Sequence, residues 1–217
     1  LKAIYPQGAK QVMLYNATGR VSIAGKRFPY FHAIIINVSS LAKVAEYLST
    51  GMPLVERIVT VDGPAVKEPK NLIAPIGTRI SELLKVTGLK SEAGKVVVGG
   101  PMNGNAVCSV DDPIVKVSNC VLEIKEKNSV LPEPSSCIHC GRCINKCPIK
   151  INVPAVEDAL RVKDEAKREK LLIETGVRQC VDCGCCSYVC PAHRHLLATN
   201  QEAKWWLKDY ARKGGNK

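Results

Sequence analysis

The fold of this chain is decided by the stretch Cys137-Ile-His-Cys140-Gly-Arg-Cys143-Ile-Asn-Lys-Cys147-Pro148 and by its second copy, Cys180-Val-Asp-Cys183-Gly-Cys-Cys186-Ser-Tyr-Val-Cys190-Pro191. Both copies read C-x2-C-x2-C-x3-C-P. Together they hold nine of the 11 cysteines in the chain, eight of them at the positions of the pattern. Because each copy packs its first three thiols so closely, the spacing predicts that each copy wraps a compact inorganic group.

This spacing is the one by which bacterial proteins hold two 4Fe-4S clusters, with the fourth cysteine of each run binding the other cluster. We therefore expect the first cluster on Cys137, Cys140, Cys143 and Cys190. The second cluster is expected on Cys180, Cys183, Cys186 and Cys147. Two four-cysteine zinc sites are the alternative, although zinc proteins usually place their cysteines in two separated pairs.

Cysteine usage of this kind indicates a compartment in which thiols stay reduced. The expected location is the cytoplasm, either free or peripheral on the cytoplasmic face of the inner membrane. No stretch approaches the roughly 18 apolar residues of a membrane span, and the first residues lack the pattern of a signal peptide.

The formal net charge of the 217 residues is +11. Each oxidised cluster with its four thiolates contributes about −2, so the surface is expected to remain basic. A basic surface favours an acidic ferredoxin or a flavoprotein, an anionic lipid surface or a nucleotide as partner. Nucleic acid is not expected, because only 5% of the residues are aromatic and no nucleic-acid-binding motif is present.

The expected fold class is α/β followed by α, beginning with a remnant Rossmann-like layer. Residues 1–52 predict the C-terminal part of a Rossmann-like nucleotide domain. The β-branched run 33–38 predicts a buried strand, Ser39 or Ser40 a helix cap, and Gly51 the end of a helix over 41–48.

Residues 53–127 predict a β-grasp (SLBB-like) domain. We expect strands over 57–64 and 71–77, and a third that begins at Lys95. A helix is expected over 80–86, begun by Thr78 or Ser81 and closed by Gly88. Closing strands are expected over 114–117 and 119–124. The glycine-rich stretch 99–104 matches no phosphate-binding motif and predicts a tight turn with positive φ.

Residues 128–136 predict a linker into a helical 2x(4Fe-4S) ferredoxin domain over 137–200. Apolar positions among the charges between the two motifs predict helices that pack one face on the clusters. Residues 201–217 form a basic aromatic tail with Trp205 and Trp206. This tail is expected either to anchor at a membrane interface or on a partner, or to dock on its own domain.

Several further stretches resemble the C subunit of the Rnf electron-transport complex, an ion-translocating ferredoxin:NAD oxidoreductase. They are Tyr5-Pro-Gln-Gly8, Thr18-Gly-Arg20, Asn37-Val38, Gly51-Met-Pro-Leu54, Arg57-Ile-Val-Thr-Val61, Pro69-Lys-Asn71, Ile76-Gly77, Gly99-Gly-Pro-Met102 and the two cysteine runs. More distantly, the chain resembles the flavin- and NADH-binding subunit of respiratory complex I. That resemblance implies a nucleotide domain, an SLBB domain and an iron-sulfur helical region, in this order.

The resemblance implies that Gly8 and Asn37 belong to a flavin pocket, and it makes FMN a further cofactor to test. Two departures count against FMN in this chain. The glycine-rich flavin loop that would precede Tyr5 is absent, and Ala9-Lys10 replaces the acidic residue that usually follows the Y-P-Q-G turn. We therefore expect either a fragment or a member that lacks the flavin half.

The expected function is transfer of low-potential electrons between an NADH or flavin site and a ferredoxin-type or membrane partner, as one subunit of an electron-transfer complex. Such a subunit would not be an enzyme alone. One alternative is a soluble Rnf-C-like partner of a cobalamin or amino-acid reductase system. Another is an SLBB module that binds a small ligand.

Five other side chains have expected roles. His193 and His195, close behind Cys190, either donate hydrogen bonds to cluster sulfur or face solvent. Cys185 is the odd thiol of the second motif and either points elsewhere or exchanges with Cys186 as ligand. Cys108 and Cys120 are expected to be small buried hydrophobic residues.

Overall fold

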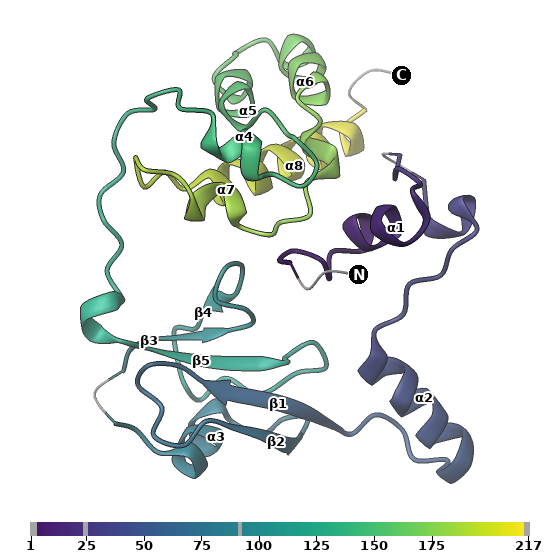
Figure 1. The fold of residues 1–217 in the computed structure, drawn as a ribbon, viewed down its shortest axis with the longest axis vertical. Coiled ribbons are helices and arrows are strands. Elements are labelled where there is room, and N and C mark those ends of the chain that lie inside the picture. Colours follow the sequence, from purple (N-terminus) through teal and green to yellow (C-terminus); the bar gives the residue numbers. More distant parts are fainter. Residues whose placement is uncertain (1–3, 24–25, 91–92, 215–217) are drawn as a thin grey trace. The chain divides into compact units, whose positions relative to one another are not determined.

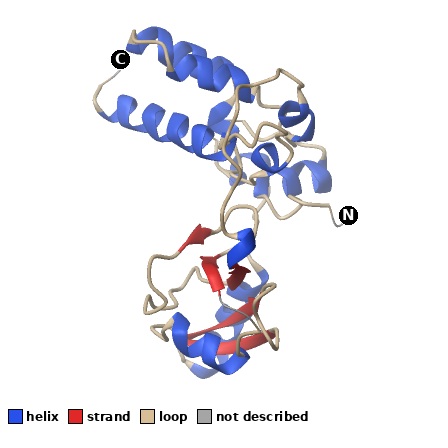
Figure 2. Cartoon of the chain, turned by 90° about the vertical axis from the view of Figure 1, so that its left-hand side faces the viewer, coloured by secondary structure: helices blue, strands red, loops and turns tan. Residues whose placement is uncertain are grey.

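The computed structural model describes residues 4–23, 26–90 and 93–214, which divide into two compact units. One unit joins the residues up to 35 with those from 132 onward, and the other comprises residues 36–131. The described residues thus form a mixed α/β chain with one helical unit and one unit built on a sheet (Figures 1 and 2).

The sheet of the second unit has five strands in the order β2-β1-β5-β3-β4. Its strands are β1 (Glu56–Asp62), β2 (Lys70–Pro75), β3 (Ala93–Val98), β4 (Asn105–Ala106) and β5 (Cys120–Lys125). β1 and β2 form an antiparallel hairpin, β5 runs parallel to β1, and β3 runs antiparallel to β5. The strands predicted near 57, 71, 95 and 119 are therefore confirmed.

One face of this sheet packs on α3 (Ile80–Thr87) to form the core of the unit. Val59 and Val61 of β1 alternate with more exposed neighbours, as period-two patterning predicts. On α3, Ile80 and Leu83 supply the facing apolar stripe. The helix is closed by Gly88 as predicted, but its N-cap is Arg79 rather than Thr78 or Ser81.

The glycine-rich stretch after β3 is a tight turn, as predicted. Gly99 has φ +108, a region that L side chains rarely adopt, and the backbone N–H of Gly104 donates to the carbonyl oxygen of Gly100 at 2.7 Å. This turn leads directly into the short strand β4, which the sequence pattern did not predict.

The strand predicted over 114–117 is wrong. Ile114 is fully buried and exchanges hydrogen bonds with the backbone around Thr78, but the chain turns at once afterwards. The Ser118 hydroxyl accepts a hydrogen bond from the N–H of Val115, and Val117 is 82% exposed. A hydroxyl that satisfies the backbone locally competes with strand pairing.

The strand predicted over 33–38 is also wrong. The described part of residues 1–52 contains α1 (Lys10–Thr18), a 3-10 helix η1 (Phe28–Phe31) and α2 (Val38–Thr50), with residues 33–37 extended and unpaired. Ile34 is 79% exposed. A strand requires a neighbour for its backbone groups, and no described strand lies beside this segment.

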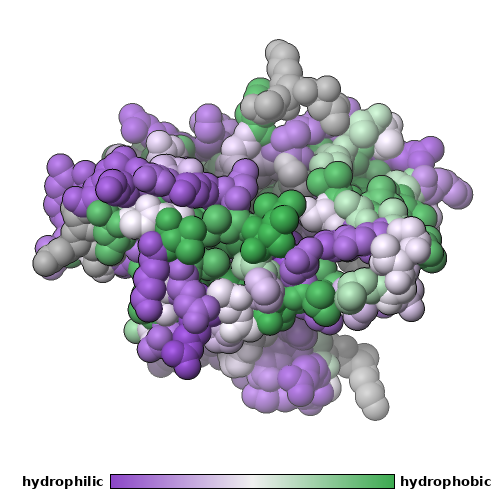
Figure 3. Space-filling view, turned by 90° about the horizontal axis from the view of Figure 1, so that it is seen from below, coloured by the Kyte–Doolittle hydropathy of each residue, from purple (hydrophilic) through white to green (hydrophobic). Residues whose placement is uncertain are grey.

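The helix predicted over 41–48 exists as α2 and ends at Gly51 as expected. Its N-cap is Asn37, whose side-chain oxygen accepts hydrogen bonds from the N–H groups of Ser39 and Ser40. None of its residues is buried. Figure 3, which looks at the chain of Figure 1 from below, shows hydrophobic side chains gathered on the surface.

The first unit contains the helices that lie within and after the cysteine runs. They are α4 (Arg142–Lys146), α5 (Val153–Leu160), α6 (Glu165–Glu174), α7 (Cys185–Tyr188) and α8 (Leu196–Arg212), with the 3-10 turn η3 (Val177–Gln179). A further 3-10 turn, η2 (Glu126–Asn128), belongs to the sheet unit. α5 and α6 confirm the helices predicted between the motifs. Val156, Leu172 and Ala203 meet in the core, where cysteines of both runs pack against them.

Of the two tryptophans in the tail, Trp206 docks on its own unit, as one of the two expectations has it. Trp206 packs against the core, stacks on Tyr210 with ring centroids 4.9 Å apart and lies under the Arg168 guanidinium. Trp205 points outward and is 66% exposed. Residues 215–217 of the predicted tail lie outside the described residues.

None of the helices in the described ranges combines the length and the apolar character that crossing a membrane requires.

Candidate metal centres

The structure brings the cysteines of the two runs together around two separate cavities. Four thiols line the first cavity, three from the first run and one from the second: Cys137, Cys140, Cys143 and Cys190. The other walls include Pro154 and Glu157 of α5 and Arg194. The loop that carries the first three thiols turns at Gly141, which is left-handed and starts α4.

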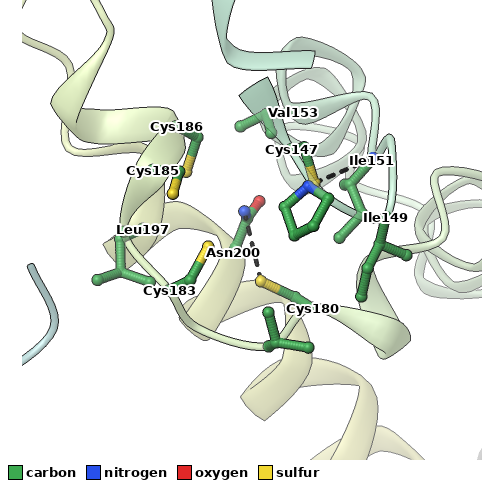
Figure 4. Close-up of a pocket in the computed structure, with 13 residues that line it drawn as sticks. Cys147, Ile149, Ile151, Val153, Cys180, Cys183, Cys185, Cys186, Leu197 and Asn200 are labelled. Atoms are coloured by element: carbon green, nitrogen blue, oxygen red, sulfur yellow. Dashed lines mark hydrogen bonds between the residues drawn. The ribbon is translucent and has the colours of Figure 1, made fainter. Parts of the chain in front are cut away.

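The second cavity has the reciprocal composition (Figure 4). Its thiols are Cys180, Cys183 and Cys186 of the second run, Cys147 of the first run, and Cys185. Leu197 and Asn200 of α8 line it as well. The structure therefore places the fourth cysteine of each run beside the first three of the other.

The two cavities are built by an internal repeat, because each cysteine of the second run follows its counterpart by 43 residues. The backbone repeats at the same interval. His139 and Asp182 both have positive φ, of 54 and 51, and Gly141 and Gly184 both cap a short helix in the left-handed region. These conformations curl each loop around its own cavity.

Within the described part of the chain, three hydrogen bonds reach thiol sulfurs. The backbone N–H of His139 donates to Sγ of Cys137 at 3.4 Å, and that of Ile151 donates to Sγ of Cys147 at 3.4 Å. The side-chain Nδ2 of Asn200 donates to Sγ of Cys180 at 3.7 Å. Figure 4 shows the two bonds at the second cavity as dashed lines.

Glu157 on α5 and Asn200 on α8 occupy equivalent places, since they too are separated by 43 residues. The Glu157 carboxylate accepts hydrogen bonds from Arg161 and Arg194. At the second cavity Lys204, the counterpart of Arg161, donates instead to Asp182 and to the Cys180 carbonyl oxygen. Sequence reasoning missed these side chains, although extending the 43-residue repeat beyond the cysteines would have found them.

The thiols of the second cavity are the more deeply enclosed. Burial raises the pKa of Cys180 and of Cys183 to about 11 each and that of Cys186 to about 12. In the first cavity burial raises the pKa of Cys143, and Cys140 is exposed. Buried thiols stay neutral until a metal displaces their protons, so metal binding in either cavity would release protons.

The remaining cysteines and histidines have distinct environments. Cys185 is buried and lines the second cavity, whereas Cys108 is exposed, contrary to the expectation, and Cys120 is half-buried. His193 and His195 are exposed, and neither donates a hydrogen bond to sulfur among the described residues. The solvent-facing alternative holds for both.

The two residues predicted for a flavin pocket lie in different units. Gly8 belongs to the turn before α1 and has open space where a side chain would be, and Asn37 caps α2. In the same turn as Gly8, the Tyr5 hydroxyl donates to the backbone carbonyl oxygen of Cys183. The Y-P-Q-G turn is thus tied to the second cysteine run.

Within the described residues, no three His, Cys, Asp or Glu side chains surround a single point closely enough to hold one metal ion. Cluster thiolates bind different irons and do not meet at one point. Metal analysis is the measurement that separates the iron and zinc alternatives.

Comparison with known proteins supports the same interpretation of the two cysteine runs. Residues 129–191 match a family model described as "4Fe-4S dicluster domain". This match covers both cysteine runs, so an iron-sulfur dicluster domain is present.

Curated relatives are similar over a longer stretch. Over 174 residues the chain is 37% identical to the C subunit of the proton-translocating ferredoxin:NAD(+) oxidoreductase complex of Clostridium ljungdahlii, and the match covers 78% of this chain and 38% of the relative. It is 35% identical over 148 residues to the C subunit of the Na(+)-translocating ferredoxin:NAD(+) oxidoreductase complex of Acetobacterium woodii, covering 68% of this chain and 33% of the relative.

A third relative is the C subunit of the ion-translocating oxidoreductase complex of Yersinia pestis bv. Antiqua, 38% identical over 146 residues, which are 66% of this chain and 24% of the relative. The chain therefore spans between about a quarter and two fifths of the length of these relatives. The matches confirm the resemblance to Rnf C subunits.

Proposed function

We propose that this chain, a homologue of the C subunits of ion-translocating ferredoxin:NAD(+) oxidoreductase complexes, is an iron-sulfur electron-transfer component of such a complex. The single observation that carries the proposal is the reciprocal composition of the two cavities, each with three thiols from one run and the fourth from the other. This exchange is what the spacing of a two-cluster protein requires.

The donor set fits two 4Fe-4S clusters, because soft thiolates are the ligands that such clusters take. In the proposed assignment Cys137, Cys140, Cys143 and Cys190 hold one cluster, and Cys180, Cys183, Cys186 and Cys147 hold the other. When bound, the clusters supply one-electron chemistry.

The protein's own task is to hold, bury and orient these ligands. The apolar core around Val156, Leu172 and Ala203 packs against cysteines of both runs and excludes water from them. The backbone N–H groups of His139 and Ile151 donate to ligand sulfur. Neither cavity needs a general acid or base for this role, because single-electron transfer moves no proton at a protein group.

The partners in this proposal are other subunits of the complex, with an acidic ferredoxin or a flavoprotein exchanging electrons with the chain. The location is the cytoplasm or the cytoplasmic side of a membrane complex, where thiols remain reduced. FMN is not assigned to the described residues, because Gly8 and Asn37 lie in separate units.

The sheet unit fits a β-grasp domain of the SLBB kind. A hairpin, a helix and a returning strand that runs parallel to the first strand at the centre of the sheet support this assignment. The Rossmann-like assignment of residues 1–52 rests on the family resemblance alone.

The test is anaerobic purification followed by analysis of iron, acid-labile sulfide, zinc and flavin. We expect about eight iron and eight sulfide per chain, with little zinc and substoichiometric flavin. Four or fewer irons together with stoichiometric zinc would overturn the proposal.

A further inference from the structure

We infer that Asn200 is a positioning residue that raises the reduction potential of the cluster on Cys180, Cys183, Cys186 and Cys147. The inference deepens the proposed function, since it rests on cluster binding at the second cavity. It concerns one cluster of the two, because the equivalent place at the first cavity is taken by Glu157.

The geometry of Asn200 points to a ligand in this cavity. The residue is 2% exposed on α8, and its Nδ2 lies 3.7 Å from Sγ of Cys180. Its Oδ1 is buried and has no hydrogen-bond partner among the described residues. A cluster offers only hydrogen-bond acceptors, so it is the Nδ2 donor of this buried amide that can address cluster sulfur.

The Cys180 side of the bond is held from α8 as well. Lys204 lies one helical turn after Asn200 and donates to the Cys180 carbonyl oxygen at 3.1 Å, and it also pairs with Asp182. Helix α8 therefore contacts Cys180 twice, because Lys204 holds its backbone and the Asn200 amide donates to its sulfur. These two contacts keep the Asn200 N–H directed at the sulfur in both redox states.

The direction of the effect follows from charge. Reduction adds one electron, supplied in a titration by dithionite, and part of the added negative charge resides on the ligand sulfurs. An N–H dipole aimed at such a sulfur stabilises the reduced form more than the oxidised form, and hydrogen bonds to sulfur are one of the determinants of cluster potentials. Removing the donor therefore lowers the potential.

Glu157 cannot play the same part at the first cavity. A carboxylate only accepts hydrogen bonds, and that of Glu157 is engaged by Arg161 and Arg194. Among the described residues no side-chain donor reaches a sulfur of Cys137, Cys140, Cys143 or Cys190. The exchange of an amide for a carboxylate is thus one of the differences between the two repeated sites.

The experiment is an anaerobic redox titration of the whole chain, followed by electron paramagnetic resonance, on the wild type, Asn200→Leu and Asn200→Asp. Leucine has nearly the same size and no donor, and aspartate keeps the shape but replaces the donor by an acceptor. Gln201→Leu is the matched control, because it removes an exposed amide from the same helix. Cys147→Ala identifies which midpoint belongs to the second cavity, because Cys147 lines that cavity.

We expect both Asn200 variants to keep two clusters and to lower the midpoint of the second-cavity cluster alone, with the larger shift for aspartate. Gln201→Leu should leave both midpoints at their wild-type values. If leucine reduces the iron content, the same-shaped aspartate variant carries the test.

Unchanged midpoints in variants with full iron content, or equal shifts of both clusters, would overturn the inference and leave the proposed function intact. A wild-type protein that binds no clusters would instead overturn the proposed function.

Discussion

The hydroxyl of Tyr5 donates a hydrogen bond to the backbone carbonyl oxygen of Cys183, with 2.5 Å between the two oxygens. The two residues are 178 positions apart in the sequence. Burial and the nearby thiols of Cys183 and Cys185 raise the pKa of Tyr5, so its hydroxyl keeps its proton and remains a donor. This bond ties the first described turn of the chain to the loop that carries three thiols of the second cavity.

Removing that hydroxyl should loosen the N-terminal turn. We expect Tyr5→Phe to reduce the local stability of the turn and α1 by about 1 kcal/mol, the usual worth of one such bond. Amide hydrogen exchange over residues 4–18 measures the change. Tyr15→Phe on α1 is the control, because Tyr15 is exposed and makes no side-chain hydrogen bond in the described structure. Equal exchange in both variants would show that the Tyr5 bond contributes nothing.

Cys147 should support the cavity of the other run. We expect Cys147→Ala to lose roughly half of the iron and to expose Cys180, Cys183 and Cys186 to alkylation, because Cys147 shares their cavity. Anaerobic alkylation with peptide mass spectrometry measures which thiols are freed. Cys108→Ala is the control at an exposed thiol outside both runs. Alkylation confined to Cys137, Cys140 and Cys143 would refute the assignment.

The chain alone should not accept electrons from NADH. A two-electron hydride donor needs a flavin to pass single electrons to a cluster, and Gly8 and Asn37, the two residues expected beside a flavin, fall in separate units of the chain. Dithionite should bleach the cluster absorbance anaerobically, whereas NADH should do so only after a flavoprotein partner is added. Bleaching by NADH alone would sink this prediction.

Glu123 should make the sheet unit less stable as the pH rises. Its side chain on β5 is 1% exposed, neither carboxylate oxygen has a hydrogen-bond partner among the residues that the structure describes, and burial raises its pKa above the ordinary 4.5. The folded state therefore holds the proton more tightly than the unfolded state, so stability is lost as the pH increases above about 4.5.

Glu123→Gln should remove that loss and stabilise the unit at pH 7 to 8 by on the order of 1 kcal/mol, with little difference near pH 4. Hydrogen exchange of β1 and β5 at the two pH values provides the measurement. Glu126→Gln, an exposed neighbour, is the matched control. A variant that is less stable than wild type at pH 8 would mean that the carboxylate has a stabilising partner.

Leu172 should hold the helices of the first unit on the cysteine loops. It is fully buried on α6 in the core that packs against both runs. We expect Leu172→Ala to cost about 2–5 kcal/mol and to lower cluster retention, whereas Ile173→Ala, at a position that is 44% exposed, should cost far less. Urea denaturation followed by circular dichroism, together with iron content over time, measures both effects.

The sequence alone determined the chemistry and the helical unit of this protein. Thiol spacing is a local property, and the proline-terminated runs predicted which cysteines share a cavity before any coordinates. Regular apolar periodicity also predicted α5, α6, α3 and the hairpin of β1 and β2, since the backbone hydrogen bonds of each of these elements form within a short stretch of sequence.

Elements whose state depends on distant neighbours were not predictable in this way. Residues 33–38 have the composition of a strand but find no partner strand among the described residues, and residues 114–117 are turned by the Ser118 hydroxyl. Cys108 belongs to a residue type that is usually buried, but its side chain is exposed. In each case the conformation or exposure depends on neighbouring segments of the folded chain, which the composition of the stretch itself does not specify.

Tertiary structure alone decided the surroundings of the clusters. The Asn200 amide meets the Cys180 sulfur, and the Tyr5 hydroxyl meets the Cys183 carbonyl oxygen, because packing brings α8 and the N-terminal turn onto the same loop. The ligand type can be read from residue order, since the spacing of the thiols within each run is a local property of the sequence. A hydrogen bond forms only when the folded chain brings its donor and acceptor to within about 3 or 4 Å of each other. The hydrogen bonds that adjust the properties of each site therefore depend on the tertiary structure.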